Sequence, residues 1–138
     1  MKILVIDGQG GRMGKTLVET LRRRGFSGEI LAVGTNSAAT TAMLKAGADE
    51  GATGENPVVV ASRRADVILG PMGIVAANSM LGEITPAMAL AVSESEARKV
   101  LIPVNRCRIQ VAGVQEMSLG EYTERAVELV LAMVGEKA

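Results

Sequence analysis

The amino-terminal segment reads Lys2-Ile3-Leu4-Val5-Ile6-Asp7-Gly8-Gln9-Gly10-Gly11-Arg12-Met13-Gly14-Lys15-Thr16-Leu17-Val18-Glu19-Thr20-Leu21, and it predicts the architecture of the whole chain. Its first apolar run favours a buried strand, which ends in a glycine-rich turn. From Met13 onward the apolar residues recur at helical spacing. Exposed N–H groups and the positive end of the helix macrodipole then face the turn and attract phosphate. We therefore expect the first βα unit of a Rossmann-type domain.

The glycine spacing favours a nucleotide or dinucleotide as the ligand. The pattern G-x-G-x-x-G fits at Gly8 and Gly10 but fails at Met13. The spaced pattern G-x-x-G-x-x-G fits at Gly8, Gly11 and Gly14. In this pattern Gly8 makes the turn and Gly11 lets the backbone approach a pyrophosphate. Gly14 lets the helix pack on its strand.

A P-loop of a nucleotide hydrolase is an alternative interpretation. Gly14-Lys15-Thr16 matches the end of the pattern G-x-x-x-x-G-K-[ST]. The position five before Gly14 is Gln9 instead of glycine, and no strand ends in a metal-binding acid, since Asp66 opens its strand. Another phosphate-bearing ligand, or a glycine-rich turn that binds nothing, remains open as well.

Length and composition limit the possible classes of protein. The 138 residues suit one domain, spanning 1–138, and 48% of them are hydrophobic, which argues against disorder. Lys plus Arg and Asp plus Glu both number 15, so the basic excess of a nucleic-acid binder is missing. The single cysteine is consistent with a reducing compartment. No apolar run reaches membrane-spanning length, and we expect a cytoplasmic protein that binds neither nucleic acid nor membrane.

The hydrophobic pattern predicts a three-layer, doubly wound α/β fold. Strands are expected at residues 3–6, 29–33, 49–52, 66–70, 100–104 and 109–114, and helices at 13–24, 37–46, 57–64, 86–98 and from 119 until Gly135. Only four residues, 105–108, separate the last two strands, which is too short for a parallel crossover. We therefore expect a mostly parallel sheet whose last two strands form an antiparallel hairpin.

Helix starts are indicated by four local patterns. Asn36, and Asn56 before Pro57, are expected to cap the helices that follow them. Thr85-Pro86 combines a cap with proline at the first helical position. Ser118-Leu119-Gly120-Glu121 is a capping box.

The end of the second predicted strand departs from the usual NAD pattern. An acidic residue belongs there to hold the ribose hydroxyls, but Thr35 and Asn36 occupy the place. They are expected either to bind ribose as neutral groups or, for Asn36, to serve only as a helix cap. No neighbouring arginine is available for a 2′-phosphate.

Other candidate residues lie where parallel strands end, at the switch-point crevice. Gly70, Pro71 and Gly73 follow one strand there, and the expected hairpin brings Arg106 and Arg108 to the same edge. The full set expected to hold the ligand is Gly8, Gln9, Gly10, Gly11, Arg12, Met13, Gly14, Thr35, Asn36, Gly70, Pro71, Gly73 and Arg106.

The sequence offers few groups for catalysis. Histidine is absent, so proton transfer would fall to Asp, Glu, Lys, Cys or Tyr. The polar groups expected on the ligand edge are those of Asp7, Lys15, Glu55, Glu83, Arg106, Cys107 and Arg108. Asp7 more commonly hydrogen-bonds loop N–H groups than reacts. Cys107 lies between Arg106 and Arg108, where a thiol becomes reactive, although a lone cysteine is more often a small hydrophobic residue. No catalytic residue and no metal site is assigned.

Two resemblances bear on these expectations. The run Gly8-Gln9-Gly10-Gly11-Arg12-Met13-Gly14 resembles the NAD(P)H-binding fingerprint of dihydrodipicolinate reductase. Most of the chain is similar to a family of short bacterial proteins without an established activity, and this resemblance implies a Rossmann-like fold. It is carried by residues 6–11, 34–36, 51–56, 78–86 and 102–107.

The sequence therefore predicts a Rossmann-like module that binds or senses a nucleotide, with NAD or NADP as the first candidates. We expect a homodimer that buries apolar helix surface. The alternatives are a minimal NAD(P)-dependent oxidoreductase whose site a partner subunit completes, and the P-loop hydrolase.

Overall fold

A computed structural model describes residues 1–104 and 108–137. Five strands form one sheet in the order β3-β2-β1-β4-β5, and every neighbouring pair is parallel. The strands are β1 (Lys2–Asp7), β2 (Glu29–Gly34), β3 (Glu50–Thr53), β4 (Val67–Pro71) and β5 (Arg98–Ile102). The order reverses at β1, so the switch point lies between β1 and β4, the strand that starts the second half.

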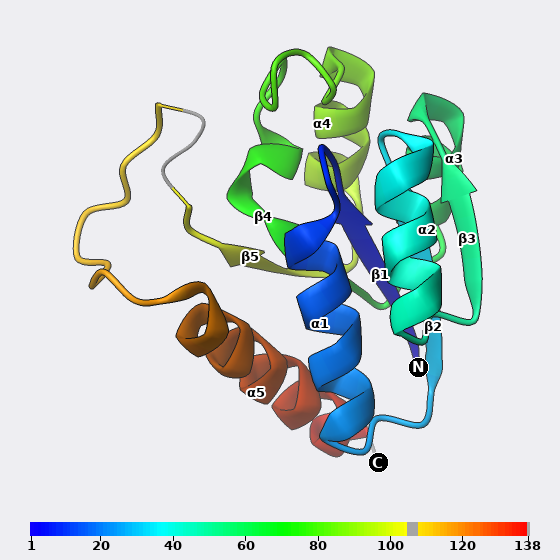
Figure 1. The fold of residues 1–138 in the computed structure, drawn as a ribbon, viewed down its shortest axis with the longest axis vertical. Coiled ribbons are helices and arrows are strands. Elements are labelled where there is room, and N and C mark those ends of the chain that lie inside the picture. The colour runs from blue at the N-terminus through cyan, green and yellow to red at the C-terminus, as the bar shows by residue number, and fades with distance from the viewer. Residues whose placement is uncertain (105–107, 138) are drawn as a thin grey trace.

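The helices cover both faces of this sheet (Figure 1). They are α1 (Arg12–Arg23), α2 (Ser37–Ala46), α3 (Glu55–Ser62), α4 (Pro86–Glu94) and α5 (Leu119–Lys137), with a 3₁₀ turn, η1 (Met72–Val75), after β4. Helices α1, α2 and α5 pack on one face, and α3 and α4 pack on the other. The predicted three-layer arrangement is confirmed.

Strand β1 supplies the core of both layers, because its side chains alternate between the two faces. Ile3 and Val5 are fully buried among residues of α1, α2 and α5. Leu4 and Ile6 are fully buried among residues of α3, α4 and η1. A central parallel strand needs apolar residues at every position, which is what the run Ile3 to Ile6 provides.

Most of the expected helix caps are present. The Asn36 side chain accepts a hydrogen bond from Ala39 N–H, Thr85 accepts from Met88 N–H, and Pro86 stands at the first helical position. At the expected capping box, the Ser118 hydroxyl accepts from Glu121 N–H as a cap and donates to the Glu121 carboxylate, in place of the backbone N–H of Ser118. The cap of α3 is wrong by two residues, since Gly54 takes the position predicted for Asn56.

The predicted antiparallel hairpin is wrong. The described part of the connection, residues 103–104 and 108–118, contains no strand, and β5 is the edge of an all-parallel sheet. Pro103 follows β5 directly and has no N–H to continue a ladder. Ile109, Val111 and Val114, whose spacing suggested a strand, are 40%, 44% and 43% exposed. The segment runs outward from the sheet before it returns to α5 (Figure 1). Arg106 and Cys107 lie outside the described residues.

The boundary between α4 and β5 also differs from the prediction. The sequence predicted a helix to Arg98, but α4 ends at Glu94 and β5 already begins at Arg98. Among the described residues, none of the helices combines the length and apolar character needed to cross a membrane.

Gly70 provides a test of this packing. A Cβ atom added there would lie 2.4 Å from the carbonyl oxygen of Ile6 on the neighbouring strand. Because backbone cannot move aside cheaply, we expect Gly70→Ala to lower the free energy of unfolding by roughly 1–3 kcal/mol, measured by urea denaturation. Gly135→Ala is the control, because a Cβ there meets no atom within 4 Å, and it should leave stability unchanged or slightly higher. Equal stability of the two variants would contradict the packing.

Candidate functional site

Asp7 joins the end of β1 to the first turn of α1. Its side chain is 5% exposed. Oδ1 accepts a hydrogen bond of 2.8 Å from Gly8 N–H, and Oδ2 accepts one of 2.6 Å from Gly14 N–H. Gly11, at the N-cap of α1, has no side chain to do this. The predicted structural role of Asp7, bonding loop N–H groups, is confirmed.

The environment of Asp7 pulls its pKa in opposite directions. Burial disfavours the charged carboxylate and raises the pKa, while the hydrogen bonds from Gly14 and Gly8 lower it. The negative charge of Glu83 raises it further. The net result is a pKa above the ordinary aspartate value.

Three backbone amides at the start of α1 have no hydrogen-bond partner among the described residues. The N–H groups of Gly8 and Gly14 are bonded to Asp7, that of Gly11 to the Gly8 carbonyl, and that of Gln9 to Glu83. The remaining amides are those of Gly10, Arg12 and Met13. Free N–H groups at a helix N-terminus form an anion site, because the macrodipole adds to their partial positive charge.

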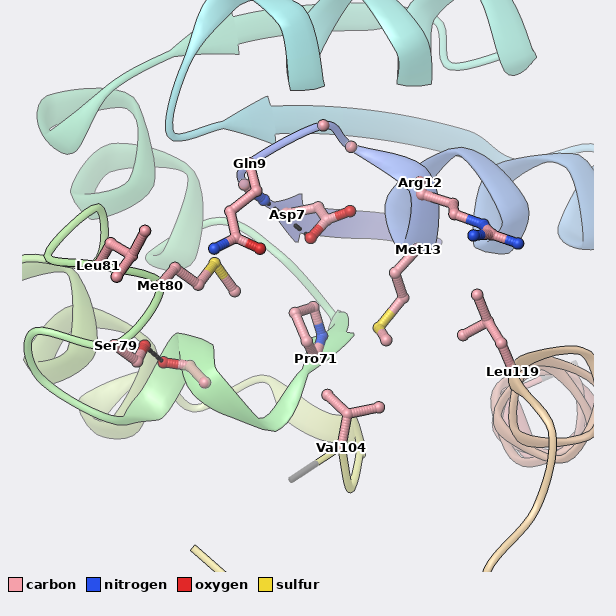
Figure 2. Close-up of a pocket in the computed structure, with 14 residues that line it drawn as sticks. Asp7, Gln9, Arg12, Met13, Pro71, Ser79, Met80, Leu81, Val104 and Leu119 are labelled. Carbon is pink, nitrogen blue, oxygen red and sulfur yellow. Dashed lines mark hydrogen bonds between the residues drawn. The ribbon is translucent and has the colours of Figure 1, made fainter. Parts of the chain in front are cut away.

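These amides open onto a cleft of about 630 Å³. The glycine-rich loop forms one wall, and Pro71 and Met80 lie opposite it (Figure 2). The Met13 side chain reaches down toward Pro71, with Val104 beyond it (Figure 2). The complete lining is Asp7, Gly8, Gln9, Gly10, Gly11, Arg12, Met13, Pro71, Gly73, Ser79, Met80, Leu81, Val104 and Leu119. A ligand with an anionic end and an apolar body suits these surroundings.

Not every predicted residue lies at this cleft. Gly14 is behind the loop, and Gly70 packs against β1. Thr35 and Asn36 do not line the cleft, and Arg106 is outside the described residues. Eight residues of the expected ligand-holding set do line the cleft: Gly8, Gln9, Gly10, Gly11, Arg12, Met13, Pro71 and Gly73. Asp7, which the sequence offered for proton transfer, lines it as well.

The sequence identified Pro71 and Gly73 on the opposite wall but missed five other lining residues. Ser79, Met80 and Leu81 come from the segment after η1, and Val104 and Leu119 flank the connection between β5 and α5. One signal was available for the first group, because the segment follows a parallel strand that ends at the ligand-binding edge. Leu119 had no such signal, because the sequence does not show that the first residue of α5 lies near the glycine-rich loop.

Glu83 supplies a carboxylate at the end of β2, where the sequence has no acidic residue. Its Oε1 accepts hydrogen bonds from Gln9 N–H (2.8 Å), from the Thr35 hydroxyl and from the Asn36 side-chain amide (3.1 Å). Burial works against the charge of this carboxylate, but these three bonds outweigh it and hold the pKa of Glu83 below its ordinary value. Asn36 also donates to the Gln9 carbonyl at 2.8 Å. Thr35 and Asn36 thus bind the chain's own groups.

Glycine is needed at different positions of the loop for different structural reasons. Gly11 has φ +74°, and a Cβ there would lie 2.7 Å from the Ala39 Cα of α2. Its lack of a side chain therefore serves helix packing, and the expected close approach to a pyrophosphate stays a prediction, since Gly11 also lines the cleft. At Gly14 a Cβ would lie 2.8 Å from the Asp7 Cβ, which fits its expected role in packing the helix on its strand. Only at Gly10 within the loop is there no atom within 4 Å.

The residues of the P-loop alternative point elsewhere. Lys15 does not line the cleft, and its Nζ lies 3.9 Å from Glu19 Oε1 on the same helix. The Thr16 hydroxyl donates to the Arg12 carbonyl at 2.9 Å. A Walker lysine and hydroxyl would face the phosphates and their metal. Among the described residues, no group of three acidic, histidine or cysteine side chains is placed to hold a metal ion.

The comparisons with known proteins agree on the architecture. Residues 2–135 match the model of a family described as "Domain of unknown function (DUF3842)". No curated protein matches the sequence. Prephenate dehydrogenase from A. aeolicus, solved with hydroxyphenyl propionate and NAD+, is similar over 92% of this chain, with 24% identity and a TM-score of 0.52. The chain spans only 38% of that protein.

A second solved structure is more distant. The dodecameric FMN-dependent UbiX-like decarboxylase from Escherichia coli O157:H7 aligns over 98% of this chain and 94% of its own, with 16% identity and a TM-score of 0.46. At 24% identity, the similarity to prephenate dehydrogenase describes the fold and leaves the ligand open.

The hydrogen bonds of Glu83 with Gln9, Thr35 and Asn36 predict that the stability of the folded protein depends on pH. A lowered carboxylate pKa contributes stability that is present above the unfolded-state value, about 4.3, and is lost as the pH falls through the lower folded value. We expect Glu83→Gln to lower the free energy of unfolding by about 1–2 kcal/mol at pH 7. At a pH below both the folded-state and the unfolded-state pKa of Glu83, the variant and the wild type should be equally stable. Urea titrations at several pH values measure this. Glu128→Gln, at an exposed site on α5, should show no such trend. A pH-independent effect of Glu83→Gln would contradict the assignment.

Proposed function

The chain belongs to the DUF3842 family, and we propose that it is a module that binds or senses a nucleotide or dinucleotide. The observation that carries this proposal is the set of unpartnered amides of Gly10, Arg12 and Met13. They stand at the positive end of α1 and open onto a cleft with mainly apolar walls. A phosphate binds at the amides, and the apolar part of the ligand lies against the opposite wall.

NAD and NADP are the first dinucleotides to test. The spacing of Gly8, Gly11 and Gly14 is the reason, since it follows a dinucleotide-binding pattern at the end of the first strand. NAD+ is also the nucleotide present with prephenate dehydrogenase, whose fold resembles this one.

The cleft favours binding over catalysis. Its ionisable side chains, among the described residues, are those of Asp7 and Arg12. Asp7 is committed to two loop amides, and Arg12 extends away from Asp7 toward Leu119 (Figure 2). A reductase that uses this cleft needs its proton donor from a substrate or from a partner subunit. Turnover of a reduced nicotinamide by the purified protein would support that alternative.

The oligomer that we propose is a homodimer. Ile109, Val111 and Val114 expose apolar side chains along a segment that extends from the sheet edge (Figure 1). Leu129 on α5 is 57% exposed as well. A second copy that covers this segment removes the apolar surface from water.

Gly10 gives the sharpest test of ligand binding. A side chain there meets no protein atom within 4 Å, so the fold tolerates it. Thermal shifts with NAD, NADP, FAD, FMN, AMP, ATP and GTP identify a ligand, because a compound that binds the native state raises its melting temperature. We expect Gly10→Asp to weaken that ligand about tenfold or more, since its carboxylate repels phosphate, with an unchanged melting temperature of the free protein.

Gly10→Ala is the matched control, because it adds bulk at the same position without charge and should retain most of the affinity. If none of the seven compounds stabilises the wild type, or if Gly10→Asp binds as well as Gly10→Ala, the nucleotide site is wrong.

The homodimer is tested by light scattering after gel filtration. We expect twice the 14.3 kDa mass of one chain for the wild type. Val111→Asp combined with Ile109→Asp should give the monomer mass, because buried unpaired carboxylates oppose association. Leu44→Asp, at an exposed position on α2, should remain dimeric. A wild-type monomer at high protein concentration would exclude the proposal.

A further inference from the structure

The segment Asn78–Glu83 runs from the cleft, which residues 79–81 line, to the end of β2, where Glu83 is bonded. A Cβ added at Gly8 would lie 2.6 Å from Thr35 Oγ1, 2.8 Å from Met80 Sδ and 2.9 Å from Glu83 Oε1. The space above Gly8, between the loop and the end of β2, is therefore occupied by side chains of the protein itself.

This segment is held in place at both ends. Asn78 N–H donates to the Ile84 carbonyl at 2.7 Å, and the Ser79 hydroxyl donates to the Gly73 carbonyl. Glu83 is bonded at its far end to Gln9, Thr35 and Asn36. Three donors at the β2 side of the loop are therefore bonded to a group of the protein itself.

The open cleft lies on the opposite side of β1. Its lining beyond the loop comes from β4, η1, residues 79–81, Val104 and Leu119. It includes no residue of β2 or α2 and neither Thr35 nor Asn36. A dinucleotide in a doubly wound fold spans both sides of the crevice, with its adenosine ribose at the end of β2. Here that half of the site contains the carboxylate of Glu83.

On the basis of the nucleotide binding proposed above, we propose that this site takes a mononucleotide, which is a phosphate monoester that carries one ring system. In this proposal Glu83 excludes the adenylate half of a dinucleotide. The phosphate binds the amides of Gly10, Arg12 and Met13, and the ring lies toward Pro71 and Met80. An adenylate half would have to displace Glu83 from its three donors. Its phosphate would also approach the negative charge of Glu83.

Two matched pairs of ligands test this selectivity, nicotinamide mononucleotide with NAD+ and FMN with FAD. In each pair the dinucleotide is the mononucleotide with an added adenylate. Isothermal titration calorimetry on the full chain should show at least one mononucleotide binding about tenfold or more tighter than its dinucleotide. Glu83→Ala should improve the dinucleotide and bring the two affinities to within about threefold, with the mononucleotide affinity unchanged.

Glu55→Ala is the matched control. Glu55 also accepts a hydrogen bond from a threonine hydroxyl, that of Thr85 at 2.6 Å, but this bond joins α3 to the cap of α4 and does not involve the glycine-rich loop. It should leave both affinities as in the wild type. If Glu83→Ala does not fold, Glu83→Gln replaces it, because the amide removes the charge at nearly constant size and should still improve dinucleotide binding.

The outcomes separate this inference from the proposed function. A dinucleotide that binds the wild type as tightly as its mononucleotide overturns the exclusion and leaves nucleotide binding intact. An affinity ratio that is unchanged in both Glu83 variants overturns the role of Glu83. Absence of binding by all four compounds, together with no stabilisation by the wider panel, overturns the nucleotide site itself.

Discussion

The bridge from the Asp7 carboxylate to two loop amides is the interaction on which the site depends. One oxygen holds Gly8 N–H where β1 ends, and the other holds Gly14 N–H in the first turn of α1. A short side chain thereby ties the strand to the helix and leaves the amides of Gly10, Arg12 and Met13, which line the cleft, without a partner among the described residues. Burial raises the pKa of this carboxyl, which is the electrostatic cost of placing a charge inside the loop.

The loop is enclosed by contacts from both neighbouring layers. Helix α2 approaches so closely that Gly11 has no room for a side chain, and Glu83 reaches back to Gln9 from beyond β4. The β2 side of the loop is therefore closed by protein groups and the β4 side remains open. A fold shared with dinucleotide-binding enzymes can in this way present only half of the usual crevice, because side chains and not the sheet decide which half stays accessible.

Local sequence patterns predicted the elements well where short-range physics controls them. The caps at Asn36, Thr85 and Ser118 are local hydrogen bonds. The continuous apolar run of β1 is sufficient to predict a buried strand. The hairpin was inferred from a short gap and an alternating pattern at residues 109–114. That inference failed because β5 ends at Ile102, where Pro103 follows without an N–H to continue the ladder, and residues 109–114 do not return to pair with the edge strand β5.

By itself the sequence determined a doubly wound α/β layering, a glycine-rich loop at the start of α1 and Asp7 as its support, because all of these follow from neighbouring residues. The all-parallel pairing of the sheet, up to its edge at β5, was decided by the tertiary structure. Only the tertiary structure decided what faces the loop. Thr35 and Glu83 are 48 residues apart, and their hydrogen bond exists because the parallel strands β2 and β4 end at the same edge on either side of β1. The missing acid at the end of β2 is thus supplied from another part of the chain, through a contact between segments that no local pattern connects.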